Sequence, residues 1–374
     1  MRFSALGDSA LVLTLGDAVD DALLARVQTV SAAIERKTLA GVFDVVPAFG
    51  SVTVFYDPAR TAGEALQAEI EALVREPDVS APLRPARQVE IPVGYGGELG
   101  PDLAAVAARA RKTESEVVAL HGEPEYRVHA IGFAPGFAYL AGLPAALHTP
   151  RRATPRTQVP AGAVGIGAAQ TGVYPFALPV GWNLIGRTPV AMFDAGRAEP
   201  AWLRVGDRVK FRAVSAAEFA ASARESTAPE SARIDRDRAG VVTVLKAGML
   251  TTVQDLGRTG YRASGVPLSG AADPFAARLA NLLVGNPETA AVLEFTLVGP
   301  TLRFEQDALV AVGGADFEGC PRWEPMQVAR GTTLTLGAAR RGCRGYLAVA
   351  GGWKVAPVLG SCSTYGRAGL GGPA

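Results

Sequence analysis

The stretch from His129 to Arg187 carries the residue types that a pocket for a small anion needs. Gly and Pro recur every few residues, and aromatic and arginine residues stand between them. Such spacing excludes a long helix and predicts short strands joined by turns of fixed backbone geometry. Aromatic faces and guanidinium groups on rigid turns suit the binding of a small anionic ligand. The alternative is a Gly/Pro-rich β-barrel whose turns bind nothing.

One part of this stretch offers an amide, a hydroxyl and an aromatic face in close succession. Gln170, Thr171 and Tyr174 supply these groups, and we interpret them as ligand-binding residues at the mouth of a barrel. Turn capping, with core packing of the tyrosine, is the alternative. Nearby arginines could clamp a carboxylate or phosphate, or could lie on a solvated face. They are Arg151, Arg152, Arg156 and Arg187.

His121 and Glu294 are candidates for moving protons. His121 closes a predicted helix, where it could act as a general base near neutral pH or as an imidazolium that faces the helix dipole. Glu294 follows an apolar, strand-like run, and partial burial would raise its pKa and suit it to acid or base chemistry. A hydrogen-bonded structural carboxylate is the alternative for Glu294.

A second group of polar residues lies in the later part of the chain. Asp255 and Arg258 stand on one predicted turn and could pair. Ser361, Ser363 and Thr364 supply hydroxyls and backbone N–H groups that could cradle an anion.

Several common catalytic motifs are missing from the sequence. It has no GxxxxGK[ST] phosphate loop, no HExxH metal motif and no GxSxG nucleophile elbow. The run from Gly165 to Gln170 is one glycine short of GxGxxG and lacks the strand–helix context that this motif needs. The three histidines stand at irregular spacing, so we expect no metal site.

Composition restricts the class of protein. Lys and Arg number 37 and Asp and Glu 36, and the resulting formal net charge of +1 argues against a nucleic-acid partner. The three cysteines show no CxxC spacing, which favours a cytoplasmic protein without a disulfide framework. The N-terminus lacks a signal-peptide core. No apolar run reaches the length of a membrane span, so we expect no membrane partner.

Hydrophobic spacing predicts a mostly β protein with α+β character. The chain begins with a ββαββα pattern, and then becomes rich in strands and turns, as in a closed barrel. An Ala/Ser/Glu/Arg-rich segment is expected to form a frayed helix and a linker, after which strand patterns return. The predicted parts are an N-terminal domain at 1–84, a barrel at 85–214, the linker at 215–240 and a last domain at 241–374.

Capping residues mark two helix starts. Thr113 and Glu116 have the T-x-x-E spacing of a capping box. Asp273 is a good N-cap, because Pro274 follows it at the first helical position. The apolar face of this second helix is predicted to contain Phe275, Leu279, Leu282 and Leu283.

Four motifs in the first part of the chain resemble allophanate hydrolase subunit 1. They are Gly132-Phe-Ala-Pro-Gly-Phe-Ala-Tyr-Leu140, Val164-Gly-Ile-Gly, Gln170-Thr-Gly-Val-Tyr-Pro175 and Gly181-Trp to Arg187. This family includes the B subunit of bacterial ATP-dependent 5-oxoprolinase and kinase inhibitors of the KipI type. The resemblance implies a small N-terminal α/β domain followed by a cyclophilin-like β-barrel. It adds Phe133, Pro135 and Phe137 to the expected ligand-binding residues.

The chain from Val244 onward resembles allophanate hydrolase subunit 2, to which the 5-oxoprolinase C subunit belongs. The motifs that carry this include Thr251-Thr-Val-Gln-Asp-Leu-Gly-Arg258 and Tyr346-Leu-Ala-Val-Ala-Gly-Gly352. The resemblance implies a partial second cyclophilin-like β module, because the family is longer than the part present here. It places Asp273 at a motif centre and implies a catalytic role for it. The implied ligand-binding residues of this module are Gln254, Asp255, Arg258, Ser361 and Thr364.

Together the two resemblances imply a fused B–C type subunit of ATP-dependent 5-oxoprolinase. That enzyme is a lactam hydrolase, which opens 5-oxoproline to L-glutamate with hydrolysis of ATP, and we expect ATP with Mg²⁺ as co-substrate. The implied partner is an A-type subunit, and the subunit 1 and subunit 2 modules are expected to pack on each other. A second copy of the chain could form a homo-oligomer. We also expect that truncation of the second module could inactivate the protein.

Two other functions remain open. The same pair of modules resembles the carboxyltransferase part of a urea carboxylase or allophanate-type system, although the sequence has no Met-Lys-Met biotin attachment site. A KipI-like inhibitor of a histidine kinase is the other alternative, and it would need only the first 211 residues.

Overall fold

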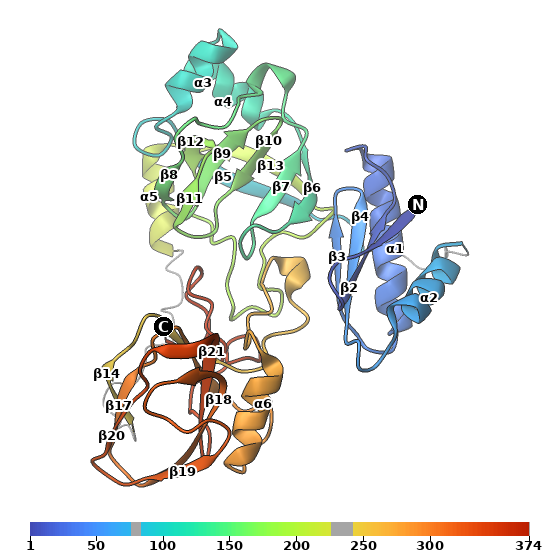
Figure 1. The fold of residues 1–374 in the computed structure, drawn as a ribbon. Helices are drawn as coiled ribbons and strands as arrows, with labels where there is room; N and C mark the ends of the chain where they lie inside the picture. The colour runs from blue at the N-terminus through green and yellow to red at the C-terminus, as the bar shows by residue number, and fades with distance from the viewer. Residues whose placement is uncertain (76–83, 226–241, 374) are drawn as a thin grey trace. The chain divides into compact units, whose positions relative to one another are not determined.

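The computed structural model describes residues 1–75, 84–225 and 242–373, and Figure 1 shows its ribbon. The protein is mostly β with a smaller share of helix, as predicted. None of the helices within these ranges combines the length and the apolar character needed to cross a bilayer.

Two compact units make up the chain. The first contains residues 1–229 and 259–267, and the second contains residues 230–258 and 268–374. The chain therefore leaves the second unit once, joins the first unit for a short segment and then returns. The domain boundaries expected from the sequence stay predictions, and residues 226–240 of the expected linker lie outside the described residues.

The first unit begins with four antiparallel strands and two helices, in the predicted ββαββα order. Alternate residues of the strands face the helices and form a core with them. The first helix starts at Asp20, whose carboxylate accepts the Leu23 N–H at 2.7 Å. The elements are β1 (Arg2–Ala5), β2 (Ala10–Thr14), α1 (Asp21–Lys37), β3 (Val42–Ala48), β4 (Ser51–Tyr56) and α2 (Gly63–Arg75).

A closed seven-stranded barrel follows, and it confirms the predicted cyclophilin-like barrel. The strand order is β6-β13-β5-β12-β9-β10-β7, and β7 pairs back to β6. Closure leaves no free edge among these strands. The strands are β5 (Gln88–Tyr95), β6 (Tyr126–Ile131), β7 (Ala138–Ala141), β9 (Ala163–Gly167), β10 (Gln170–Val173), β12 (Asn183–Arg187) and β13 (Arg208–Ala213).

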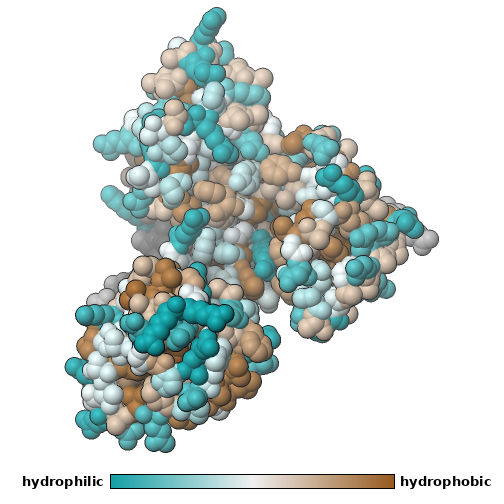
Figure 2. Space-filling view, viewed as in Figure 1, coloured by the Kyte–Doolittle hydropathy of each residue, from teal (hydrophilic) through white to brown (hydrophobic). Residues whose placement is uncertain are grey.

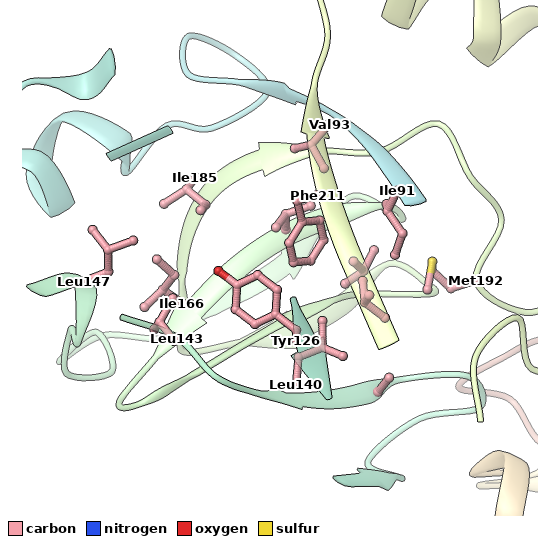
Figure 3. Packing of buried hydrophobic residues seen from close by; sticks show 14 of the residues in the cluster. Ile91, Val93, Tyr126, Leu140, Leu143, Leu147, Ile166, Ile185, Met192 and Phe211 are labelled. Atoms are coloured by element: carbon pink, nitrogen blue, oxygen red, sulfur yellow. The ribbon is translucent and has the colours of Figure 1, made fainter. Parts of the chain in front are cut away.

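The barrel interior is a packed apolar core. Figure 3 shows Tyr126 and Phe211 at its centre, with aliphatic side chains around them. The N-terminal sheet continues into the barrel, because Ala48 of β3 pairs with Ala130 of β6. Smaller elements lie on the barrel: α3 (Leu103–Ala110), α4 (Glu114–Gly122), η1 (Ala145–Leu147), β8 (Arg156–Val159), β11 (Leu178–Val180) and α5 (Ala216–Glu225).

The capping box predicted for α4 is present. The Glu116 N–H donates to Thr113 Oγ1 at 3.2 Å, and the Thr113 N–H donates to Glu116 Oε2 at 2.7 Å. Two of the orphan donors at the start of the helix are therefore satisfied by this pair.

The part of the second unit that the structure describes is a β module with two sheets and a helix of 10 residues. One sheet has the order β14-β17-β20 and the other has the order β15-β16-β21-β18-β19. The strands are β14 (Val242–Lys246), β15 (Thr251–Gln254), β16 (Val292–Thr296), β17 (Thr301–Phe304), β18 (Ala308–Phe317), β19 (Pro325–Val328), β20 (Thr333–Thr335) and β21 (Ala339–Val349). The helix is α6 (Pro274–Leu283).

The start of α6 is as predicted, but its predicted apolar face is only partly correct: Leu283 packs on the core, whereas Phe275 and Leu282 are exposed. Asp273 Oδ1 accepts the Ala276 N–H at 3.0 Å. The buried residues of the helix are small, chiefly alanines, whereas Phe275 is 73% exposed and Leu282 is 57% exposed. Small side chains on the buried face let the helix approach the sheet closely, and Phe275 and Leu282 point outward. Figure 2 shows apolar side chains exposed among hydrophilic ones on the viewed face of the protein.

Candidate functional site

A cavity of about 230 Å³ opens on the barrel of the first unit. Its walls combine aromatic rings with two guanidinium groups, which is the combination expected for a small anionic ligand. The rings and guanidinium groups of this lining belong to Phe133, Phe137, Tyr139, Arg151, Arg152, Tyr174 and Trp182.

The aromatic walls pack on one another around Phe137. Its ring centroid lies 4.9 Å from that of Tyr139, 5.0 Å from that of Tyr174 and 5.6 Å from that of Trp182. Edge-on and tilted pairs of this kind are favourable and hold the rings rigidly. Phe133 covers this cluster edge-on and is 53% exposed, whereas Phe137 is 1% exposed. The cavity therefore has a fixed aromatic floor and one exposed ring at its rim.

Glycines in the barrel strands make room for this aromatic cluster. A Cβ atom at Gly167 would lie 2.4 Å from Trp182 Nε1, and one at Gly172 would lie 3.1 Å from Phe137 Cζ. Neither distance admits a side chain without movement of a ring. The Gly-rich character of the stretch thus follows from the need to seat large rings against the strands.

Asp102 orients Arg152, one of the two arginines that line the cavity. Arg152 Nη1 donates to Asp102 Oδ1 at 2.8 Å, and the Leu184 N–H donates to Asp102 Oδ2 at 2.7 Å. Arg156 donates to the same carboxylate through both terminal nitrogens, at 2.7 and 2.9 Å. Burial opposes ionisation of Asp102, but the hydrogen bonds and charges of Arg156 and the other donors outweigh it and hold its pKa below the ordinary value.

The sequence did not predict a role for Asp102, and only two of the four arginines that could clamp a ligand line the cavity. Asp102 stands where an N-cap of α3 would be, but its side chain makes no capping hydrogen bond. Arg156, a predicted ligand residue, does not line the cavity, because Asp102 engages it in a two-pronged ion pair. Arg151 and Arg152 line it instead. Nothing local in the sequence signals contacts between residues about fifty positions apart.

Arg152 has one donor that the described part of the protein does not pair. Its Nε is buried and has no hydrogen-bond partner among the residues that the structure describes. Arg151 is exposed at the same cavity, and its charge opposes the rise that burial causes in the pKa of Tyr139. An anion in the cavity would therefore meet one oriented guanidinium and one exposed guanidinium.

The predicted group of Gln170, Thr171 and Tyr174 is divided by the strand geometry. Tyr174 lines the cavity, as the ligand-binding interpretation requires. Thr171 is fully buried inside the barrel, where its hydroxyl donates to the Gly165 carbonyl at 3.0 Å. Gln170 pairs with Gly167 in the β9–β10 ladder and does not line the cavity. Successive residues of a strand face opposite sides, so the three cannot converge.

His121 lies inside the barrel and not at the cavity. Its Nδ1 is 2.8 Å from the Tyr95 hydroxyl, and its Nε2 is 2.9 Å from Thr171 Oγ1. The ring stacks on Phe211 with centroids 4.6 Å apart. Burial lowers the pKa of His121 to about 3, so the ring is neutral in the physiological range. The neutral ring is therefore not the imidazolium expected at the helix end, and a catalytic role stays a prediction.

The remaining predicted residues of this unit have mixed positions. Phe133 and Phe137 line the cavity, and Pro135 lies in the turn between them without lining it. Arg187 lies outside the cavity and donates from Nε to the Ala161 carbonyl at 2.9 Å.

The predicted polar residues of the second unit gather around the segment from Val358 to Gly372. The Asp255 carboxylate accepts hydrogen bonds from the Ser361 hydroxyl at 2.6 Å and from the Cys362 N–H at 2.6 Å. Burial opposes its ionisation, but hydrogen bonds from Ser361 and its neighbours hold the pKa of Asp255 below the ordinary value. These contacts tie the segment to β15.

Arg258 and Asp255 do not form the expected ion pair among the described residues. Arg258 is only 1% exposed and donates to the carbonyls of Val358 and Ser363 and to Ser269 Oγ. Asp255 and Arg258 instead each form hydrogen bonds with the 358–364 segment.

Gln254 and Thr364 also bind this part of the chain. Gln254 Oε1 accepts the Gly270 N–H at 3.1 Å, and Thr364 Oγ1 donates to the Gly372 carbonyl at 2.9 Å. The five predicted ligand residues are thus brought together, and the contacts they make are with the protein itself.

Glu294 and Asp273 meet at the start of α6. Glu294 Oε2 accepts the Ala272 N–H at 2.7 Å, and Oε1 pairs with Arg344 Nη1 at 3.1 Å. The Asp273 N–H donates to the Tyr346 hydroxyl at 2.8 Å. These contacts favour the structural alternative for both residues, and their catalytic roles stay predictions. No group of three or more His, Cys, Asp or Glu side chains in the described ranges is arranged to hold a metal ion.

Comparison with known protein families matches both units. The carboxyltransferase domain with subdomains C and D matches residues 1–203, and the carboxyltransferase domain with subdomains A and B matches residues 264–374. The chain is 38% identical over 235 residues to the B subunit of 5-oxoprolinase from Bacillus subtilis (strain 168), covering 59% of this chain and 96% of that protein.

The later part of the chain matches two kinds of protein. It is 47% identical over 140 residues to the C subunit of 5-oxoprolinase from Escherichia coli (strain K12), which is 35% of this chain and 44% of that protein. It is also 38% identical over 138 residues to urea amidolyase of Saccharomyces cerevisiae, which is 35% of this chain and 8% of that protein. The chain thus spans less than half the length of the 5-oxoprolinase relative that matches its later part.

A solved structure resembles almost the whole chain. The crystal structure of TTHA0988 is 38% identical in sequence and superimposes with a TM-score of 0.82, covering 98% of this chain and 72% of that chain. Its agreement over both matched parts supports the fold described above.

Proposed function

Because the chain belongs to the carboxyltransferase-domain family, with subdomains C and D in its first part and A and B in its second, we propose that it is a subunit of an ATP-dependent 5-oxoprolinase. Its relatives include B and C subunits of 5-oxoprolinase, and family membership confirms the resemblance to allophanate hydrolase subunits 1 and 2. The observation that carries the proposal is the aromatic cavity with Arg151 and Arg152 at its wall.

The cavity has the chemistry that 5-oxoproline requires. This substrate is a small ring with one carboxylate and one lactam. Its ring methylenes would pack on Phe137, Tyr174 and Trp182, and its carboxylate would accept hydrogen bonds from Arg152 and Arg151. A volume of about 230 Å³ lies below the ~300–1,000 Å³ of sites for drug-sized ligands, which suits so small an acid.

The reaction needs ATP because a lactam is a stable amide. Transfer of the γ-phosphoryl group to the lactam oxygen would make the ring carbon a better electrophile. Phosphoryl transfer leaves ADP, water then adds at that carbon, and breakage of the C–N bond gives γ-glutamyl phosphate. A second water hydrolyses this acyl phosphate to L-glutamate and phosphate. Stabilisation of the transferring phosphoryl group calls for cations and positioned donors.

The residues that line the cavity are suited to binding a substrate more than to proton transfer. Among the described residues they include two arginines and two tyrosines but no carboxylate and no imidazole. We therefore propose that this chain binds and orients 5-oxoproline, and that an A-type subunit supplies the nucleotide and the remaining catalytic groups.

A coupled assay tests this proposal. The full chain is combined with an A-type subunit, and release of ADP that depends on 5-oxoproline is measured. Arg152→Gln should raise the KM for 5-oxoproline by about tenfold or more, because a charge-assisted hydrogen bond contributes roughly 1.5–3 kcal/mol. The matched control is Arg208→Gln, because Arg208 forms an exposed pair with Glu125 elsewhere on the barrel and should leave the KM unchanged.

Absence of 5-oxoproline-dependent ADP release would contradict the proposal, provided that an intact C-type subunit has also been added. That subunit supplies the part of the C-type relative that this chain does not match.

A carboxyltransferase role with urea is the second candidate, and the match to urea amidolyase favours it. The discriminating test supplies a biotin carboxylase and a biotinylated carrier domain and measures carboxylation of urea. Carboxylated product would support this second role, whereas the 5-oxoprolinase proposal expects none. A kinase-inhibitor role stays a hypothesis.

A further inference from the structure

A short segment at 259–267 belongs to the first unit although the chain on both sides of it belongs to the second. We call this segment the arm. It contains the 3-10 turn η2 (Arg262–Ser264), which ends at Gly265 in the left-handed region with φ 77°. It contacts both the N-terminal sheet and the barrel turn beside the cavity.

Arg262 anchors the arm in a notch of the N-terminal sheet. Its Nη1 pairs with Asp44 Oδ2 at 2.9 Å, and its backbone N–H donates to Asp44 Oδ1 at 3.3 Å. The guanidinium carbon lies 4.1 Å from the centre of the Phe55 ring and 5.4 Å from that of Phe43. Asp44 is 5% exposed. A buried carboxylate, with two aromatic rings that face the guanidinium group, is a specific site for arginine.

The notch follows from the pairing of β3 with β4. Asp44 is the cross-strand partner of Phe55, and the register shifts between Val42 and Asp44. Val54 and Tyr56 face the helices in the buried core, so Phe55 faces the opposite side of the sheet. The irregular register at Phe43 turns a second ring toward this side.

The arm also holds the turn that forms one wall of the aromatic cavity. The Gly136 N–H donates to the Ser264 carbonyl at 2.9 Å. Gly265 lies so close that a Cβ on it would be 2.7 Å from the Ala134 carbonyl oxygen. The turn begins and ends with Phe133 and Phe137, which line the cavity.

We infer that the arm is a positioning element for the cavity: Arg262 fixes it to the Asp44–Phe55 notch, and the Ser264 carbonyl then holds the 132–137 turn through Gly136. A segment that follows the first strands of the second module in sequence thereby controls the shape of the ligand site of the first module. The inference does not depend on which ligand the cavity binds.

Hydrogen exchange of the full chain, followed by mass spectrometry, tests the inference without any ligand. Gly265→Ala would force a Cβ against the Ala134 carbonyl, and Arg262→Gln would remove the ion pair. Each should raise the exchange rate of the amides in the 132–137 turn by about tenfold or more, with the strands β9, β12 and β13 unchanged. The double variant Asp44→Asn/Arg262→Gln should behave like Arg262→Gln, which excludes an effect of a buried unpaired carboxylate.

Gly260→Ala is the matched control. Gly260 also lies in the arm and has φ 87°, but a Cβ on it would meet nothing within 4 Å. It therefore carries the same backbone penalty without the contact to the turn, and it should leave exchange at 132–137 unchanged. The inference is overturned if Gly265→Ala and Arg262→Gln raise exchange only within the arm, or if Gly260→Ala affects the turn as much as Gly265→Ala does.

Discussion

Arg152 and Arg156 share the carboxylate of Asp102, yet only Arg152 reaches the cavity. The shared partner removes conformational freedom from both side chains before any ligand binds, and this is how a binding site becomes preorganised. Asp102 therefore acts on the ligand only through Arg152. Burial alone would disfavour its charge, and the two arginines compensate for it.

His121 makes the stability of the barrel depend on pH. Its pKa in the folded protein is about 3, below the value of 6.5 for an unperturbed histidine. Between these values the unfolded chain binds a proton that the folded chain does not, so the free energy of unfolding should fall as pH falls from about 6.5. His121→Gln should weaken this dependence, although it lowers stability at neutral pH.

Urea denaturation at a series of pH values measures this effect. The matched control is His148→Gln, because His148 is an exposed histidine of the same barrel region, and the comparison separates burial of the ring at position 121 from the loss of one histidine. Equal slopes for the wild type and His121→Gln would contradict the prediction.

At the scale of the element, the glycines of β9 and β10 determine which aromatic side chains can pack against the barrel strands. They allow rings from other elements to lie flat against the strands, where a larger residue would keep them away. The spacing of the glycines indicated that turns and strands alternate. It did not show why position 167 must be glycine, which is that the Trp182 ring, fifteen residues later, occupies the space of a Cβ.

Gly167→Ala tests this role of the strand. Its Cβ would lie 2.4 Å from Trp182 Nε1, and overpacking of this kind should cost about 1–3 kcal/mol in the free energy of unfolding. Gly132→Ala is the control, because a Cβ there meets nothing within 4 Å. Urea denaturation followed by tryptophan fluorescence compares the two, and equal stability would show that the ring is free to move aside.

At the scale of the whole molecule, the two units have separate hydrophobic cores. Phe211 belongs to the barrel core, and Phe304 belongs to the core of the second unit. Separate cores allow separate unfolding, so a single free energy of unfolding need not describe this chain.

Two core truncations test that independence. Phe211→Ala should destabilise the first unit by about 3–5 kcal/mol and Phe304→Ala should destabilise the second by a similar amount, because each removes a fully buried ring. Hydrogen exchange at increasing urea should report faster exchange in β5 and β13 for the first variant and in β16 and β21 for the second. Loss of protection in both units from either variant would show that they unfold together.

Sequence by itself determined the order of elements, the barrel, the capping of α4 and α6, and the stretch that contains the cavity. These are local properties, because periodicity, capping residues and turn residues act over a few positions. Only the tertiary structure decided that Asp102 orients Arg152, that His121 lies inside the barrel, and that small residues form the buried face of α6.

The same holds for the arm, whose partner Asp44 lies more than two hundred residues earlier. Contacts of this kind depend on which faces the strands turn toward each other, and one sequence carries no local signal of that pairing.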